Sequence, residues 1–219
     1  MHVGVLGGTG PAGSGLAARL ASVGVEVTIG SRSKERAQDT CSSIVKRWPD
    51  LDLPLEPGEN ATAADAEVVV VATPWDAAAA TVASVGTQLD GKVVISMANA
   101  LTRMGHEFEP LVPPRGSVAA HVQSAVVHAR VAAAFHHVPA KALANLAEPV
   151  ESDVLICSDH PSAFETTAEL VDLIPGLRPL NAGSLSNAAP IEAITAVLLQ
   201  LNVRYRTRAA VRFTGIDLP

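Results

Sequence analysis

The feature that most constrains the fold is a glycine-rich turn close to the amino terminus. The stretch "GGTGPAG" lies between the apolar run "HVGVL" (2–6) and the helical pattern "GLAARLASVG", so Gly8, Gly10 and Gly13 match GxGxxG between a strand and a helix. One glycine permits the tight turn, the next lets the backbone approach a pyrophosphate, and the third lets helix and strand pack closely. The helix N-terminus adds free N–H groups and partial positive charge. We therefore predict a dinucleotide site and favour it over a purely structural glycine turn.

The remaining pattern alternates apolar strands with amphipathic helices. Further strands are predicted at 25–29, 67–72, 92–96 and 130–135, and helices at 11–23, 33–47, 75–87 and 116–126. The strands are apolar throughout, as strands buried on both faces of a parallel sheet should be. Later come a run at 153–157, a helix at 161–173, a short segment at 177–180 and a long helix at 185–203. This pattern predicts an α/β fold: a Rossmann-type doubly wound parallel sheet over residues 1–140, with a smaller C-terminal α/β-helical extension over 141–219.

Composition limits the partners. The chain has 219 residues, 48% of them hydrophobic, and a net charge of -6, which disfavours nucleic acid and anionic membranes as partners. The longest apolar runs, at 67–72 and 194–201, are far shorter than the roughly 20 residues of a membrane span. Cys41 and Cys157 form no CxxC pair, and no secretory pattern precedes Val3. We expect a cytoplasmic protein whose partners are small molecules.

The second predicted strand ends in "GSRSKER" (30–36), where NAD-binding chains commonly carry an Asp or Glu. That carboxylate binds the ribose 2′-hydroxyl of NAD but would repel a 2′-phosphate, and glycine removes the repulsion. Ser31 can donate to a phosphate oxygen, Arg32 can clamp the phosphate or stack on the adenine, and Lys34 and Arg36 add positive charge. We favour NADP(H) over NAD(H). Capping of the second helix by Ser31 or Ser33 is the alternative, and it is compatible with phosphate binding.

Several catalytic signatures are absent from the sequence. Short-chain dehydrogenases need a Tyr with a Lys four residues later, but the only tyrosine is Tyr205 and Ala209 follows it. β-Hydroxyacid dehydrogenases use a lysine of their second domain, and the last lysine here is Lys141. No HExxH, GxSxG or clustered Cys/His set occurs, so we expect no metal site. A hydride carrier without an acid–base pair suggests direct hydride transfer between two cofactors, in which the protein orients the rings and excludes water.

Four ordered blocks carry a family resemblance. The chain resembles the F420-dependent NADP oxidoreductases in "GVLGGTGPAGSGLAARLASVGVEVTIGSR", "VVVATPWDAA", "AAAFHHVPAKALANL" and "GLRPLNAGSLSNA", and the similarity extends over about residues 2–200. The resemblance implies reversible hydride transfer between NADP(H) and the deazaflavin coenzyme F420, bound face to face. It also implies a cleft closed by residues 141–219, a homodimer, and no catalytic acid, base or nucleophile.

The resemblance also implies which residues bind the nucleotide. The pyrophosphate and the 2′-phosphate would be held by the glycine loop and the basic turn, through Thr9, Gly10, Pro11, Ala12, Ser31, Arg32 and Arg36. Pro11 has no N–H, so one phosphate contact must come from Ala12 or from water.

Three strand ends would line the nicotinamide and deazaflavin pocket: Thr73, Pro74 and Trp75; Ser96, Met97 and Ala98; and His136, Val138, Pro139 and Ala140. Ordinary packing is an equally weighted alternative for Trp75. His136 is expected to contact and position the deazaflavin or its phosphate chain, whereas His137 should point to the opposite face. Residues 138–140 would form an apolar shelf for the ring. Asn187 is expected to be a polar contact near the ring, with N-capping of the long helix as its alternative.

The C-terminal arginines and two further functions stay open. Arg204, Arg206, Arg208 and Arg212 could attract the anionic tail of F420, but a solvated or dimer-facing stripe at helical spacing is favoured. The chain could instead reduce another acceptor with NADPH, such as a flavin or a ferric chelate. It could also bind NADP(H) as a redox sensor without turnover.

Overall fold

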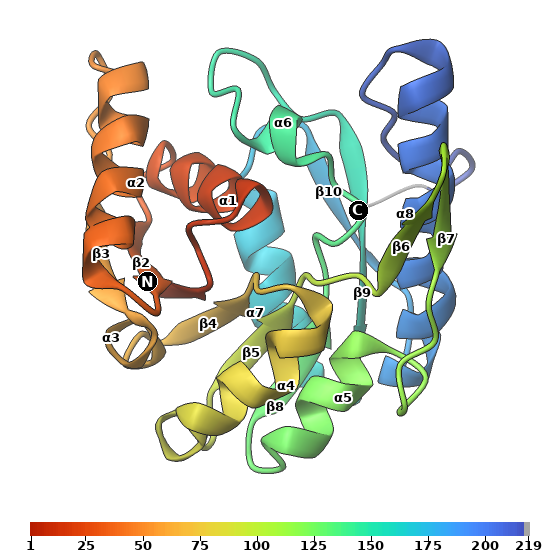
Figure 1. The fold of residues 1–219 in the computed structure, drawn as a ribbon, viewed down its shortest axis with the longest axis horizontal. Coiled ribbons are helices and arrows are strands. Elements are labelled where there is room, and N and C mark those ends of the chain that lie inside the picture. Colours follow the sequence, from red (N-terminus) through yellow and green to blue (C-terminus); the bar gives the residue numbers. More distant parts are fainter. Residues whose placement is uncertain (217–219) are drawn as a thin grey trace.

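The strands form one large sheet and one hairpin. A computed structural model describes residues 1–216 (Figure 1). In these residues the large sheet contains eight strands: β1 (His2–Leu6), β2 (Glu26–Ser31), β3 (Leu55–Glu59), β4 (Val68–Val71), β5 (Val93–Ser96), β8 (Arg130–Ala133), β9 (Ser152–Ser158) and β10 (Leu177–Asn181). The hairpin pairs β6 (Leu101–Met104) with β7 (Glu107–Pro110) in antiparallel fashion.

Helices connect the strands. They are α1 (Pro11–Ala21), α2 (Lys34–Arg47), α3 (Asn60–Ala64), α4 (Trp75–Ser84), α5 (Val118–Ala125), α6 (Ala140–Leu143), α7 (Pro161–Asp172) and α8 (Ala188–Tyr205), with 3₁₀ turns η1 (Gly86–Leu89) and η2 (Leu185–Asn187). Within residues 1–216, none of the helices combines the length and the apolar character that a membrane crossing requires.

The sheet topology brings six strand ends to one edge. The strand order is β10-β9-β8-β5-β4-β1-β2-β3, and the six strands from β8 to β3 are parallel. The order reverses between β1 and β4, the position at which open α/β sheets bind ligands beyond the carboxyl ends of their strands. The predicted Rossmann-type α/β fold is confirmed.

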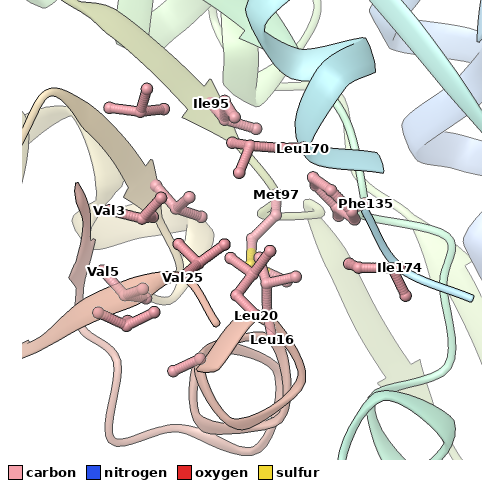
Figure 2. Close-up of a cluster of buried hydrophobic side chains, with 14 of the residues drawn as sticks. Val3, Val5, Leu16, Leu20, Val25, Ile95, Met97, Phe135, Leu170 and Ile174 are labelled. Atoms are coloured by element: carbon pink, nitrogen blue, oxygen red, sulfur yellow. The ribbon is translucent and has the colours of Figure 1, made fainter. Parts of the chain in front are cut away.

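The sheet is buried on both faces, which explains its continuously apolar strands. Val68 and Val70 of β4 join the core formed with α1, α2 and α7, whereas Val69 and Val71 join the core formed with α3, α4 and α5. Figure 2 shows part of the first core, to which α1, β1, β5 and α7 contribute side chains together with Met97 and Phe135. Successive side chains alternate between faces, so each strand needs apolar residues at every position.

Several elements escaped the sequence patterns. β3 contains Pro57 and Gly58 and has no apolar alternation, but as the edge strand it tolerates the missing N–H of proline. The β6–β7 hairpin is half-exposed and mixed in composition, so it carries no clear period. β8 ends at Ala133, two residues earlier than predicted, because Phe135 takes a left-handed φ of 63° and turns the chain.

The C-terminal segment continues the same sheet. β9 pairs antiparallel with β8, and β10 pairs parallel with β9, so the predicted division near residue 140 falls within a continuous eight-stranded sheet. The chain after α8 then returns to β9, where Asp153 N–H donates to the Val211 carbonyl. α8 itself packs against β7 and α5.

Asp153 holds this returning segment. Its carboxylate is fully buried and accepts a two-point contact from Arg178 at 2.6 and 2.8 Å, a bond from Arg212 at 3.1 Å and the Phe213 N–H at 2.6 Å. Burial alone would raise the pKa of Asp153, but these donors together lower it.

Candidate functional site

Two neighbouring cavities occupy the ligand edge of the sheet. The first cavity, of about 640 Å³, is lined by Gly7, Thr9, Gly10, Ser31, Arg32, Arg36, Asn60, Ala72, Thr73, Pro74, Ala77, Ala80, Thr81 and Ser84. The second cavity, of about 360 Å³, is bordered by the ends of β4, β5 and β8, by the turn before α6 and by one side of α8. Ala72, Thr73 and Pro74 line both, so the cavities meet at the end of β4. Two ligands could therefore meet there end to end.

Two glycines of the loop have different roles beside the first cavity. A Cβ on Gly13 would lie 2.9 Å from Ala72 Cβ and from Gly8 Cα, so Gly13 allows α1 to pack on β4. A Cβ on Gly10 would meet only the Gly7 carbonyl, at 3.8 Å, and would otherwise point into open space. The protein itself does not require glycine at position 10, whereas close approach by a ligand would.

The positions of the predicted glycine-loop residues divide into three groups. Thr9 and Gly10 line the first cavity, Ala12 borders the second, and Gly8, Pro11 and Gly13 line neither. Pro11 is the first residue of α1 and has no N–H to offer. The loop thus faces the first cavity while the helix start reaches the second.

Among residues 1–216, the charged side chains that line the first cavity both come from the basic turn. Arg32 and Arg36 are exposed at its wall and form no ion pair within residues 1–216. Ser33 caps α2 by accepting the Arg36 N–H at 3.3 Å, and Ser31 accepts the Ser33 N–H at 3.3 Å. The Ser31 hydroxyl proton is therefore available to an anion. The turn caps its helix and presents two cations at the same time.

The glycine that replaces the acidic residue also has a packing role. A Cβ on Gly30 would lie 2.8 Å from Ala63 Cβ and 3.0 Å from the Val5 carbonyl, and the Gly30 carbonyl accepts the Gly8 N–H at 2.8 Å. Any larger residue would displace α3 or β1. Charge and packing therefore both favour glycine here.

The ends of β4 and β5 form the junction between the cavities. Thr73 has a buried hydroxyl without a partner in residues 1–216, and Pro74 and Trp75 follow it at the start of α4. Trp75 borders the second cavity and packs on the core, so its two predicted roles coexist. Met97 and Ala98 line the second cavity as expected, but Ser96 is fully buried beneath it and lines neither cavity.

The turn after β8 is held by two side chains that the motifs did not reveal. Asn99 Nδ2 donates to the His136 carbonyl at 2.7 Å. The Thr195 hydroxyl of α8 lies 3.3 Å from both that carbonyl and Asn99 Oδ1, and it can donate its single proton to one of them at a time. Two side chains from separate segments thus contact the backbone of His136.

His136 is an uncharged group in the second cavity. Neither ring nitrogen has a partner in residues 1–216, and burial, followed by the adjacent His137, lowers the pKa of His136 well below its usual value. A neutral imidazole offers one donor and one acceptor. His136 can therefore satisfy a polar ligand edge without carrying charge.

His137 is anchored to β9. Its Nε2 lies 2.9 Å from the Asp153 carbonyl and 3.4 Å from the Leu155 backbone nitrogen, and the shorter contact is a hydrogen bond when Nε2 carries the hydrogen. Burial lowers the pKa of His137 too. The sequence placed the His137 side chain on the opposite face, but His137 borders the second cavity beside His136 while its Nε2 faces β9.

A buried arginine supports the apolar shelf. Val138, Pro139 and Ala140 line the second cavity and lead into α6. Arg19 of α1 is almost fully buried and donates to the carbonyls of residues 142, 143 and 145, at the C-terminal end of α6. The shelf is therefore tied to the helix that carries the glycine loop.

Within the described chain, the side chains that line the second cavity carry no formal charge. Its polar groups are Thr73, Asn99, His136, His137, Thr195 and Asn202. Among residues 1–216, no group of three or more His, Cys, Asp or Glu side chains could hold a metal ion. This arrangement can orient an uncharged ring system but offers no ionised acid or base.

The expected place of Asn187 is wrong. β10 runs antiparallel to β8, so the turn that follows it lies at the opposite edge of the sheet from the cavities. Asn187 is exposed, lines neither cavity and donates from Nδ2 to the Ala182 carbonyl at 2.7 Å. It makes no side-chain cap to α8 either.

The predicted helical stripe of C-terminal arginines is also wrong, because α8 ends at Tyr205 and Arg208 and Arg212 lie beyond it. Arg204 pairs with Glu107 at 3.0 Å, and Arg212 pairs with Glu151 and Asp153. Arg208 borders a separate small cavity that also contains Glu148 and Glu151, which would repel an anionic tail.

Two kinds of cavity residue were not predicted from the sequence. Asn99 follows β5 within three residues, a position that the strand-end rule could have identified. Asn60, Thr195 and Leu198 reach the cavities only because α3 and α8 dock there, and no local signal marks that docking.

Comparisons with known proteins agree with this geometry. The family model described as "NADP oxidoreductase coenzyme F420-dependent" matches residues 2–100. An F420-dependent NADP reductase of Methanothermobacter thermautotrophicus is 39% identical, covering 99% of this chain and 96% of that protein. Another, from Methanocaldococcus jannaschii, is 33% identical over the full length of both chains.

A solved structure supports the fold. The crystal structure of an Arthrobacter sp. FB24 protein assigned as an F420-dependent NADP reductase has a TM-score of 0.77 and 24% identity, with 97% of this chain and 98% of that chain covered. The full-length relatives establish more than the fold. This chain belongs to the F420-dependent NADP oxidoreductase family.

Proposed function

We propose that this protein transfers a hydride directly between NADP(H) and the deazaflavin coenzyme F420 where its two cavities meet. It is an oxidoreductase whose substrates are these two coenzymes. The single observation that carries the site assignment is the shared wall of Ala72, Thr73 and Pro74. In the part of the chain that the structure describes, this wall joins a cavity lined by two arginines to a cavity lined by none. The first suits a phosphorylated nucleotide and the second an uncharged ring.

The nucleotide would occupy the first cavity. Thr9, Gly10 and the N–H groups at the start of α1 would face the pyrophosphate, and Ser31, Arg32 and Arg36 would hold the 2′-phosphate. The nicotinamide would then reach Thr73, whose buried hydroxyl lacks a protein partner in the described chain. The orphaned hydroxyl at the junction suits the polar carboxamide of that ring.

The deazaflavin would occupy the second cavity. His136 would satisfy a polar edge of the ring, and Val138, Pro139 and Ala140 would support its apolar face. Asn99 and Thr195 fix the His136 backbone, so the ring contact would be positioned before binding. Reduction of F420 by NADPH also consumes one proton, which solvent would supply, because the described lining of this cavity offers no ionised acid.

The N-terminal and C-terminal parts of the chain would have different roles. Residues 1–140 would bind the nucleotide and supply the strand ends, and the C-terminal part would close the cleft with α8. Leu198 and Leu199 of α8 border the second cavity opposite the strand ends and would exclude water from the reacting carbons.

The protein would also form a homodimer through α8. This helix lies at one edge of the molecule (Figure 1), and it carries an apolar row at helical spacing, namely Pro190, Ile194, Val197 and Leu201. Val197 is 56% exposed, and the helix is apolar on both sides, as a helix buried from both sides would be. Val197→Glu should convert a dimer to a monomer in sedimentation experiments, and a monomeric wild type would refute the proposal.

The function is tested by turnover with matched acceptors. Purified protein is mixed with NADPH and oxidised F420, and the loss of deazaflavin absorbance is followed, with NADH or FMN in parallel reactions. Rapid bleaching with NADPH and F420 is expected. NADPH binding without reduction of F420 would favour the sensor, and reduction of FMN alone would favour a flavin reductase.

A further inference from the structure

Asn60 is a cavity residue to which neither the glycine motif nor the basic turn assigns a role. It is the first residue of α3 and follows the edge strand β3, yet it lies beside the glycine loop 53 residues away. Its Oδ1 accepts the Gly7 N–H at 3.1 Å. Gly7 has a left-handed φ of 69°, so this bond fixes a turn that only glycine adopts easily.

The same bond determines which way the amide faces. Because the Gly7 N–H is a donor, the side-chain oxygen of Asn60 must point toward it and the NH₂ group must point away. Asn60 lines the first cavity with Ser31 and Arg32, and no other hydrogen bond involves its side chain within residues 1–216. The NH₂ group is therefore a donor without a protein acceptor, at the wall where the basic turn meets the glycine loop.

The position along the cavity identifies the ligand group. Asn60 Oδ1 would lie 3.1 Å from a Cβ on Gly30, the residue immediately before Ser31. The 2′-phosphate is assigned to the basic turn and the pyrophosphate to the glycine loop, and the adenosine ribose connects the two. An amide NH₂ at this place faces the ribose oxygens and the phosphate they carry.

We propose that Asn60 donates a hydrogen bond to the adenosine ribose phosphate of NADP(H) and is a specificity-determining residue for that nucleotide. The inference rests on the proposed NADP(H) site. The side-chain oxygen of Asn60 binds the Gly7 N–H of the glycine loop, and its nitrogen would bind the nucleotide. A substitution that changes only the nitrogen can therefore test the nucleotide contact while the loop contact is kept.

Asn60→Asp keeps the loop contact and removes the proposed nucleotide contact. The carboxylate keeps an oxygen for the Gly7 N–H, so the loop remains held, but it replaces the donor with a second acceptor that carries charge. It would repel a 2′-phosphate yet accept a bond from the free 2′-hydroxyl of NADH. We expect the dissociation constant for NADPH to rise roughly 10- to 100-fold while that for NADH changes by less than about threefold.

Two further variants control for charge and for structure. Ala61→Asp adds the same charge to the same helix at an exposed position that does not line the cavity, and it should leave the NADPH/NADH affinity ratio within about twofold of wild type. Asn60→Ala removes both bonds and should weaken both nucleotides.

Binding is measured directly by calorimetry with NADPH and NADH, without F420, so the result does not depend on the acceptor. The inference is overturned if Asn60→Asp binds NADPH as wild type does, if it weakens both nucleotides equally, or if Ala61→Asp shifts the ratio as much. A wild-type protein that fails to bind NADPH would overturn the proposed function itself, and with it this assignment.

Discussion

Substitutions of Gly10 and Gly13 should have different effects, the first on nucleotide binding and the second on the stability of the fold. Gly10 has φ −77° and ψ 162°, which alanine adopts, and its Cβ would approach no protein atom closer than 3.8 Å. Replacement should change stability by less than about 1 kcal/mol, because the lower chain entropy of alanine offsets its poorer N-cap propensity. The methyl group would nevertheless occupy the space assigned to the pyrophosphate. Losing one charge-assisted hydrogen bond would weaken NADPH binding roughly 10- to 100-fold.

Gly13→Ala is the matched control with the opposite outcome. Its Cβ would lie 2.9 Å from Gly8 Cα, a backbone atom that cannot move aside. Overpacking of this kind costs about 1–3 kcal/mol, and at roughly 2–4 °C per kcal/mol the midpoint of thermal unfolding should fall by several degrees. Thermal unfolding and NADPH titration of both variants check the pair. If Gly10→Ala binds NADPH normally, the first cavity does not hold the pyrophosphate as described.

Three further predictions concern the nucleotide, the second cavity and pH. Arg32→Glu should raise the Michaelis constant for NADPH at least tenfold while sparing NADH, since the reversed charge repels only the 2′-phosphate, and an equal effect on both in steady-state assays would exclude that contact. Asn99→Ala removes the 2.7 Å bond to the His136 carbonyl and should raise the Michaelis constant for F420 severalfold without changing NADPH binding; calorimetric loss of NADPH affinity would contradict this positioning role. Burial raises the pKa of Glu192 to about 7, although its carboxylate accepts the Val118 N–H at 2.8 Å. Because the pKa is raised, the contribution of Glu192 to the free energy of unfolding is complete below pH 4.5 and is lost as pH rises through 7, by up to about 3 kcal/mol. The free energy of unfolding of wild type and of Glu192→Gln is measured against pH, and parallel profiles would refute this prediction.

The sequence predicted the features that depend on neighbouring residues. The strand–glycine turn–helix unit and the basic turn after β2 form their sites locally, so Gly10, Ser31 and Arg32 lie where their motifs indicated. Asn187 was misplaced because its position depends on the direction of β10, and no local pattern distinguishes a parallel from an antiparallel strand at a sheet edge.

Side chains that depend on docking between distant elements were beyond sequence reasoning. Thr195 reaches the His136 carbonyl across 59 residues, and Asn60 reaches Gly7 across 53. β3 was missed for a different reason, because an edge strand needs neither an apolar period nor every N–H.

Transfer of a deuterium label between the two coenzymes tests direct hydride transfer from NADPH to F420. NADPH deuterated at one or the other face of C4 is incubated with the protein and oxidised F420, and the reduced F420 is analysed by mass spectrometry. We expect deuterium from one of the two labelled forms to appear in full at the deazaflavin carbon that accepts the hydride. With unlabelled NADPH in deuterated water, we expect no deuterium at that carbon. Loss of the label to solvent, or reduced F420 carrying solvent deuterium at that carbon, would contradict direct hydride transfer between the two cavities.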